Sequence, residues 1–431
     1  MRATPRPPIP RPSPDIRSLQ PIAGGAGAPA TQDRQSIFVL AILGLLMGFA
    51  SISTDVYLPA LPVMAKALGS NDGAMAWTIS GYLIGFSLGQ LLWGPIGDRY
   101  GRRPPIAMGL GLFVIGSAGC ALSASAWAII GWRVAQAAGA CAGVVLARAM
   151  VRDLYAGQRA AQMLSTLMTV MAIAPLLGPL IGGQILLHAS WRAIFWVLVV
   201  VGVATMMALF ALPETLPPGQ RNREPLRLAL AAYGQLVRQR QLMGYAGAIG
   251  FYYVAAYAYI AGSPFAYIEI YHVRPQSYGL LFGAGIIGII VANLLNARLV
   301  TWLGGVRLLR WGTLVAASAG AVLAIDALTG WGGLAGLALP LLAVTGMNGL
   351  IAANAIAGAM SHFPERAGAV SALVGAIQYG SGIIGSALVG ACADGTARPL
   401  GWVIGSSCVG ALACAWLIVT PGASPGGGGS S

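Results

Sequence analysis

Residues 36–62, "SIFVLAILGLLMGFASISTDVYLPALP", decide the fold of this chain. No charged residue precedes Asp55 in this stretch, and a helix needs roughly 20 apolar residues to cross a hydrocarbon core about 30 Å thick. The whole chain of 431 residues is 57% hydrophobic and 9% charged, whereas soluble domains have about 25% charged residues. The composition therefore predicts a membrane protein.

Stretches of this kind recur to the end of the chain. Twelve are present, at residues 37–58, 75–96, 105–123, 126–148, 160–187, 191–212, 242–268, 277–300, 307–328, 332–358, 367–391 and 399–420. Their length favours helices over the strands of an outer-membrane barrel, which are about 10 residues long and alternate in polarity. We predict an all-α polytopic membrane protein with twelve transmembrane helices in two six-helix halves.

The basic residues predict the orientation of the chain. If the N-terminus is inside, the N-terminal tail and every second link contain 20 of the 25 Lys and Arg residues. The other links contain only Lys66, Arg192, Arg274 and Arg398, and Arg133 lies inside a stretch. This asymmetry follows the positive-inside rule and predicts cytoplasmic termini. It also explains the net charge of +13 without a nucleic-acid partner.

The longest polar link divides the stretches six and six. It is "PETLPPGQRNREPLRLALAAYGQLVRQRQ", and a faint repeat at an offset of 203 residues, "GRRPPIAMG" (101–109) and "GGVRLLRWG" (304–312), supports the division. Duplicated halves with a cavity between them are typical of alternating-access transporters. The predicted units are a disordered tail (1–35), an N-terminal half (36–213), a cytoplasmic linker (214–240), a C-terminal half (241–421) and a flexible tail (422–431).

Glycines and charges gather in "GQLLWGPIGDRYGRRPP" (89–105), where the second stretch gives way to the third. We expect a sharp turn over residues 94–101, with the acid between the arginines bridging to a neighbouring helix end. From Gly94 on, this segment resembles the signature Gly-x-x-x-Asp-Arg-x-Gly-Arg-Arg of the major facilitator superfamily. "RVAQAAGACAG" (133–143) is similar to the fourth-span motif of that family, with Ala137 in place of the usual glycine, and "APLLGPLIGG" (174–183) to the fifth-span motif of its antiporters.

Further segments narrow the resemblance. "STDVYLPALPVMA", "MVRDLY", "PETLPP", "SPFAYIEIYHV" and "SHFPERAGAVSAL" are together similar to the Bcr/CflA branch of drug:proton antiporters, which export bicyclomycin or chloramphenicol-type drugs. The resemblance implies a conformational switch built from these motifs. Its residues are Gly94, Asp98, Arg99, Gly101, Arg102, Arg103, Gly178, Pro179, Gly182 and Gly183.

The resemblance also implies a function. We expect proton-coupled efflux of small, moderately apolar compounds across the bacterial inner membrane, by a monomer without enzyme activity, cofactor or metal. The expected partners are a small-molecule drug, protons and the lipid bilayer. An exporter of an amino acid or metabolite and a proton-coupled nutrient symporter remain as alternatives within the family. Lys66 as the only lysine excludes a Walker-type phosphate site, which points to a gradient as the energy source.

Asp55 and Arg133 are the candidates for proton coupling. Counting about 1.5 Å per helical residue puts both toward the external side, at compatible depths. Pro59 lacks the N–H that would bond to the Asp55 carbonyl, so the helix should loosen just beyond the acid. Burial favours the neutral carboxyl and a nearby arginine favours the ionised one, so small movements could load and release a proton. The alternatives are a helix-capping role for Asp55 and a positioning role for Arg133.

Polar and aromatic side chains within the stretches are the candidates for substrate binding, because amides and hydroxyls in a bilayer need partners. Tyrosines can stack on a drug and donate hydrogen bonds to it. The candidates are Tyr57, Gln136, Tyr253, Tyr257, Asn348, Asn354, Gln378 and Tyr379. Core packing of the tyrosines and helix-to-helix hydrogen bonding of the amides are the alternatives.

Overall fold

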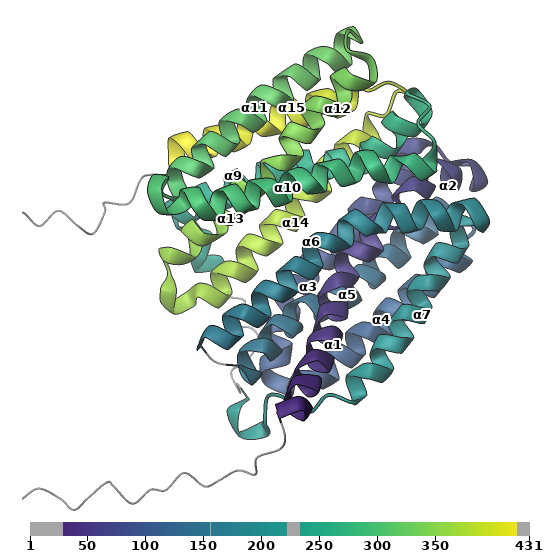
Figure 1. Ribbon diagram of the computed structural model, residues 1–431. Helices are drawn as coiled ribbons and strands as arrows, with labels where there is room; N and C mark the ends of the chain where they lie inside the picture. Colours follow the sequence, from purple (N-terminus) through teal and green to yellow (C-terminus); the bar gives the residue numbers. More distant parts are fainter. Residues whose placement is uncertain (1–28, 156, 222–232, 420–431) are drawn as a thin grey trace, which may run out of the picture.

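The protein consists of two helical bundles that lie side by side (Figure 1). The computed structural model describes residues 29–155, 157–221 and 233–419, and every regular element in these ranges is a helix. The first bundle contains α1 (Pro29–Asp55), η2 (Leu58–Ala60), α2 (Leu61–Ala67), α3 (Asp72–Tyr100), α4 (Arg103–Leu122), α5 (Ala126–Leu154), α6 (Gly157–His188) and α7 (Trp191–Phe210). After η3 (Pro218–Gln220), the second contains α9 (Arg240–Phe265), η4 (Ala266–Ile270), α10 (Pro275–Leu303), α11 (Gly305–Thr329), α12 (Gly333–Gly346), α13 (Asn348–Ser361), η5 (Pro364–Arg366), α14 (Ala367–Ala391), α15 (Arg398–Ala413) and η6 (Cys414–Ile418).

Each of the twelve predicted stretches coincides with a helix or a pair of helices. In the described part of the chain, nine spans meet both the length and the hydropathy of a membrane helix. The other three predicted stretches correspond to α3, α6 and α9, of which α6 contributes a shorter apolar segment. Glycines in α3 and tyrosines in α9 lower the hydropathy of helices that are largely buried within the bundle.

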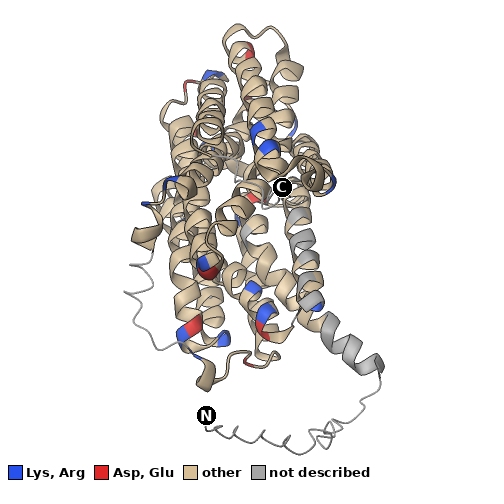
Figure 2. Cartoon of the chain, turned by 90° about the vertical axis from the view of Figure 1, so that its left-hand side faces the viewer, with Lys and Arg blue, Asp and Glu red and all other residues tan. Residues whose placement is uncertain are grey.

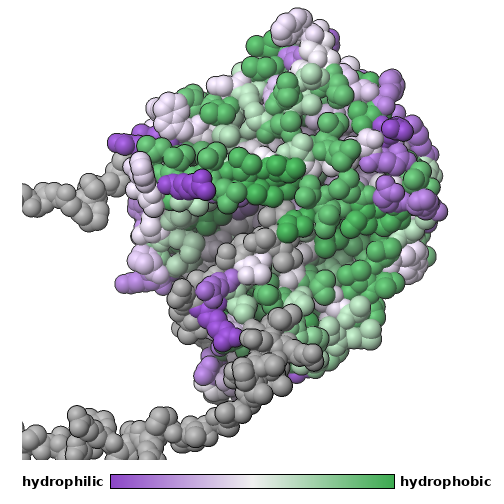
Figure 3. All heavy atoms as spheres, viewed as in Figure 1, coloured by the Kyte–Doolittle hydropathy of each residue, from purple (hydrophilic) through white to green (hydrophobic). Residues whose placement is uncertain are grey.

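The surface has the character of a membrane protein. Hydrophobic atoms cover the middle of the face in Figure 3, and hydrophilic atoms gather toward its ends. Basic residues are scattered over the side shown in Figure 2, several of them beside an acidic residue. Residues 222–232 of the predicted linker and most of the predicted tails, at 1–28 and 420–431, lie outside the described residues.

The helix ends follow from local sequence. We call the end of the bundles where α1 begins and η6 ends the proximal end, and the opposite one the distal end. The helix α1 stops at Asp55, and Pro59 lies in the following 3₁₀ turn, as its missing N–H predicts. At the distal starts of α3 and α5, the side chains of Asn71 and Ser125 accept N–H bonds of 2.7 and 3.2 Å from the first turn.

The two glycines of the faint repeat occupy matching places. Gly101 ends α3 with a φ of 94°, and Gly304 ends α10 with a φ of 76°. Both therefore end the second long helix of their half in a backbone conformation that favours glycine. The expected sharp turn over residues 94–101 is confined to Gly101, because α3 continues through Pro95 to Tyr100.

Glycines also set the closest helix contacts. A Cβ at Gly85 would overlap the Val134 carbonyl of α5, and one at Gly81 would lie 2.8 Å from the Ile130 oxygen. The glycines of α3 therefore mark its close contact with α5. On α6, Gly182 is packed just as closely against Val56.

The halves meet along two antiparallel helix pairs, α3 with α14 and α6 with α10. The first pair includes a 2.8 Å hydrogen bond between the hydroxyls of Ser80 and Ser386. At the distal end, Lys66 and Glu269 form a 2.9 Å ion pair between the halves. These contacts leave a space between the bundles nearer their middle.

Candidate functional site

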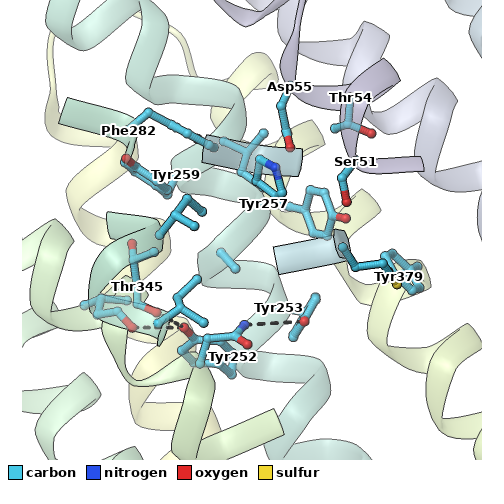
Figure 4. Close-up of a pocket in the computed structure, with 18 of the residues that line it drawn as sticks. Ser51, Thr54, Asp55, Tyr252, Tyr253, Tyr257, Tyr259, Phe282, Thr345 and Tyr379 are labelled. Carbon is cyan, nitrogen blue, oxygen red and sulfur yellow. Dashed lines mark hydrogen bonds between the residues drawn. The ribbon is translucent and has the colours of Figure 1, made fainter. Parts of the chain in front are cut away.

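A cavity of about 310 Å³ lies between the halves. Its volume is at the lower end of the range of small-molecule sites, about 300–1,000 Å³. Eight helices supply its walls, α1, α3 and α6 from the first half and α9, α10, α12, α13 and α14 from the second (Figure 4). The lining residues are Ser51, Thr54, Asp55, Tyr82, Phe86, Met171, Pro175, Tyr252, Tyr253, Ala256, Tyr257, Tyr259, Ile260, Phe282, Ile286, Ile289, Val344, Thr345, Asn348 and Tyr379.

Asp55 is the single acid among the described residues that line this cavity. It is the last residue of α1 and only 4% exposed, and Figure 4 shows its carboxyl directed from the N-terminal half toward Tyr257 of the other half. Gly178 of α6 packs against it, since a Cβ there would lie 2.9 Å from the Asp55 Cβ. The Asp55 carboxyl thus lies buried at the end of a helix and at the wall of the cavity.

Arg133 lies fully buried beside this helix end. Its Nη1 donates to the Ser53 carbonyl at 2.8 Å and to Gln136 Oε1 at 2.6 Å. The guanidinium carbon is 4.2 Å from the centre of the Tyr57 ring and 4.3 Å from that of Tyr82. The bond to Ser53 confirms that the depths of α1 and α5 match as the sequence predicts.

The guanidinium of Arg133 is only partly satisfied. Its Nε and Nη2 are buried without a hydrogen-bond acceptor, and the described ion pairs do not include one with Asp55. Its charge is nevertheless close enough to act on the Asp55 carboxyl. Because Arg133 and Asp55 are close but form no described ion pair, each of them can gain or lose a partner when the helices move.

Gln136 holds Arg133 in place and does not line the cavity. Its Nε2 donates to the Ser117 hydroxyl at 2.7 Å, which in turn donates to the Phe113 carbonyl at 2.7 Å. The glycine at 116 lets the backbones approach here, because a Cβ at Gly116 would lie 2.6 Å from the Gln136 nitrogen. The chain of bonds fixes the amide so that its oxygen faces the guanidinium.

Aromatic rings form the wall that faces Asp55. The centres of the Tyr253 and Tyr257 rings are 6.0 Å apart, and Tyr379 of α14 lies 6.2 Å from the first and 6.3 Å from the second. Phe86 of α3 joins them from the other half, 4.5 Å from Tyr379. Such rings offer flat apolar faces together with hydroxyl donors.

A break between α12 and α13 adds backbone carbonyls to the wall. The predicted stretch 332–358 is two helices that meet at Met347. The Tyr252 hydroxyl lies 2.9 Å from the Val344 carbonyl and 3.1 Å from that of Thr345, and Asn348 Nδ2 lies 3.4 Å from the Tyr253 hydroxyl. Irregular backbone in a membrane is tolerated where it borders a cavity, which is the case here.

The predicted substrate residues divide into two groups. Those brought together at the cavity are Tyr253, Tyr257, Asn348 and Tyr379. Tyr57 instead packs on Arg133, and its hydroxyl lies 3.0 Å from that of Thr78.

The remaining amides lie outside the cavity lining. Asn354 bonds to Asn296 at 2.6 Å and to the Leu350 carbonyl at 2.8 Å, the helix-to-helix role left open by the sequence. Gln378 is 8% exposed and precedes the lining residue Tyr379.

Sequence reasoning missed part of the aromatic wall. Tyr82, Phe86, Tyr252, Tyr259 and Phe282 line the cavity but were not among the candidates. Tyr252 and Tyr259 belong to the tyrosine-rich stretch 251–271, and a helix can expose about half its circumference to a wide cavity. The number of aromatic residues along α9 could have predicted that more of this helix faces the cavity than Tyr253 and Tyr257 alone.

The predicted switch segment forms a charged network at the proximal end. Arg102 is 6% exposed and donates from Nη1 to Asp98 at 2.6 Å and from Nε to Asp153 at 2.8 Å. The Thr215 hydroxyl donates to the same Asp153 carboxylate at 3.1 Å. Three separate sequence motifs, around residues 98, 153 and 214, therefore meet at one arginine.

Glu214 caps the start of α4. Its carboxylate accepts N–H bonds from Arg102 at 2.7 Å, Arg103 at 3.0 Å and Leu216 at 3.0 Å. Burial alone would raise the pKa of Glu214, but these N–H groups and the charge of Arg221 outweigh it and hold the pKa below its usual value. The carboxylate thus stabilises the turn as an anion.

The other switch residues are placed variously. Arg103 donates to the Phe210 carbonyl at 3.0 Å, and Arg99 is exposed beside Tyr100. No described heavy atom lies within 4 Å of a Cβ built at Gly94, so its packing gives no reason for glycine. Pro179 is buried inside α6, and Gly183 contacts Pro275 and Gln276 of the other half.

The family follows from comparison with known proteins. The model of the Major Facilitator Superfamily matches residues 43–386. The chain belongs to this superfamily of membrane transporters, as the sequence resemblance indicates.

Named relatives cover most of the chain. The "Uncharacterized MFS-type transporter YdgK" of Bacillus subtilis (strain 168) is 34% identical over 84% of this chain and 90% of its own length. The "Bicyclomycin resistance protein homolog" of Haemophilus influenzae is 31% identical over 88% and 95%. The "Chloramphenicol resistance protein" of Pseudomonas aeruginosa is 30% identical over 81% and 83%. These names confirm the predicted resemblance to the Bcr/CflA branch.

Solved transporters share the fold. A partially occluded inward-open conformation of the xylose transporter XylE from E. coli superposes with a TM-score of 0.69 at 16% identity, over 90% of this chain and 98% of that one. The nucleoside transporter NupG gives 0.71 at 12% identity, over 88% and 98%. At these identities the likeness concerns the fold alone, and it confirms the predicted two-half helical architecture.

Proposed function

We propose that this chain exports small, moderately apolar compounds across the inner membrane of a bacterium in exchange for protons, by alternating access. One observation carries the proposal: a cavity between the halves has a tyrosine-rich wall and a single acid, Asp55. The names of the relatives, which are bicyclomycin and chloramphenicol resistance proteins, support the class of cargo. The excess of Lys and Arg in alternate links supports cytoplasmic termini and hence a distal end that faces outside.

Coupling would arise from competition at Asp55. A carboxyl in a membrane interior is costly when ionised, so it needs a proton, a cation or donors nearby. Cargo that enters the cavity and donates hydrogen bonds to the carboxylate would favour loss of the proton, and departure of the cargo would favour its return. Arg133 would bias this exchange through its charge, and Tyr253, Tyr257, Asn348 and Tyr379 would hold the cargo.

Alternating access would use the contacts between the halves. The described contacts of α6 with α10 and the ion pair of Lys66 with Glu269 close the distal end, which supports a state open toward the cytoplasm. Movement to the opposite state would break them and close the proximal end. The glycines of α6 and the turn around Arg102 would be the moving joints. We propose a monomer as the working unit, since each chain contains both halves.

The test is proton release. Chloramphenicol is added to the purified chain in weakly buffered detergent solution with a pH indicator. An antiporter of this kind should release protons in proportion to the drug bound, and Asp55→Asn should bind drug without release. Proton uptake on binding would point to a symporter, and binding without any proton exchange would contradict coupled export.

A further inference from the structure

The sequence places Arg148 at the end of a predicted membrane span, and the structure places it next to Met171, just outside the residues that line the cavity. Because α5 continues to Leu154, this arginine lies within the helix, fifteen residues and about 22 Å beyond Arg133. Its Nη2 is 3.9 Å from the sulfur of Met171, a residue of α6 that lines the cavity.

The guanidinium of Arg148 has no partner suited to its charge among the described residues. Its Nε is buried without an acceptor, and a thioether sulfur accepts only weakly. The described ion pairs involve other residues. Arg152, one turn further along α5, carries the same charge and cannot pair with Arg148.

An unpaired, largely enclosed cation is costly unless something else pairs with it. Asp55, the acid of the cavity, is too far away to do so. It packs on Gly178, seven residues and roughly 10 Å along α6 from Met171. The cavity thus has an acid toward its distal end and aromatic rings in its wall, and a cation lies behind the lining residue Met171 toward its proximal end.

We propose that Arg148 is an anion-binding subsite that takes the carboxylate, or a similar anionic group, of amphiphilic organic acids. The planar guanidinium suits a carboxylate, with which it can form two parallel bonds. The aromatic body of the ligand then lies against the tyrosines, with its charge turned away from Asp55. The inference rests on the proposed transport through this cavity and names a class of cargo for it, organic anions beside neutral drugs.

A matched pair of probes tests the subsite. Naphthaleneacetate and naphthaleneacetamide have nearly the same shape and differ in charge. Binding of each to the purified full-length chain is measured by equilibrium dialysis in detergent. The wild-type chain should prefer the acid, and Arg148→Gln should weaken binding of the acid roughly tenfold to a hundredfold while the amide stays within about twofold. Arg148→Lys should retain part of the preference.

Arg298→Gln is the control for a general loss of positive charge. Arg298→Gln removes an exposed arginine of α10 and should change neither affinity. Unchanged amide binding by Arg148→Gln shows that the variant is folded. If chloramphenicol still releases protons but the wild-type chain binds acid and amide alike, or if Arg148→Gln weakens both equally, the subsite is refuted and the export role stands. If chloramphenicol releases no protons while the acid depends on Arg148, the export role fails and the subsite stands.

Discussion

Substitution of Gly182 tests how closely α6 packs against the turn that follows Asp55. A Cβ at this position would overlap the carbonyl oxygen of Val56 and lie 3.3 Å from Cγ of Pro59. A backbone oxygen cannot rotate aside, so Gly182→Ala must push α6 away from the turn that follows Asp55. Forcing an extra methyl group into a close-packed contact costs about 1–3 kcal/mol.

The matched control is Gly131→Ala in α5. No described heavy atom lies within 4 Å of a Cβ built there, so only the backbone effect of losing a glycine remains. That effect stabilises a helix by about 0.4–1 kcal/mol. Gly182→Ala gains the same backbone effect, so the free energies of unfolding of the two variants should differ by the packing cost alone, about 1–3 kcal/mol, which reversible unfolding in mixed micelles can measure.

Function should follow the same contact. Because Val56 is next to Asp55, displacement of α6 should also reduce chloramphenicol transport by Gly182→Ala in proteoliposomes, whereas Gly131→Ala should transport normally. Equal stability of Gly182→Ala, Gly131→Ala and the wild-type chain would show that α6 is not seated against this turn as described.

The remaining predictions concern charged groups. Asp55→Asn should abolish drug accumulation in proteoliposomes, because a proton moving down 100 mV supplies about 2.3 kcal/mol and supports a roughly 50-fold gradient; accumulation that persists would remove Asp55 from the coupling. Lys66→Glu should destabilise the closed distal end by no more than about 1 kcal/mol, since exposed ion pairs are weak, and adding Glu269→Lys should restore the closure. Distances between spin labels across the distal end measure the closure in both variants. If the double variant does not recover the wild-type distances, the ion pair does not hold this end closed. Glu214 has a lowered pKa in the folded state, so its stabilising effect is present above its unfolded-state pKa of about 4.3 and is lost as pH falls through the lower folded value. Glu214→Gln should therefore be less stable than the wild-type chain at pH 7, and the difference in thermal stability should disappear in acid. A difference in stability that does not change with pH would contradict the capping role.

Much of the fold was predictable because the bilayer constrains the sequence so strongly. Every stretch of about 20 apolar residues corresponds to a helix, and the proline after Asp55 ends α1 where its missing N–H requires. The match in depth between Asp55 and Arg133 followed from counting residues alone. These features depend on length and position along one helix.

Features that depend on how helices rotate against one another were not predictable in the same way. Tyr57 faces Arg133, whereas Tyr252 and Tyr259 face the cavity, and a period of 3.6 residues does not say which face a neighbour will cover. The break at Met347 was also missed, because glycine is frequent in membrane helices and Gly346 and Gly349 therefore did not predict an interruption. Its role depends on Tyr252, whose hydroxyl donates to the Val344 carbonyl although the two residues are ninety-two positions apart in the sequence.

Three buried or part-buried arginines show how the protein distributes the cost of charge. Arg102 at the turn after α3 meets two carboxylates, Arg133 beside Asp55 meets two oxygens but leaves two nitrogens without an acceptor, and Arg148 meets only a thioether. Removing a partner from an enclosed ion costs several kcal/mol, which the two carboxylates around Arg102 avoid in this conformation. An arginine left short of partners is tolerable where another conformation or a bound molecule supplies them. Pairing thus declines from the turn to the cavity, as our proposals require if a bound molecule or another conformation supplies partners to Arg133 and Arg148.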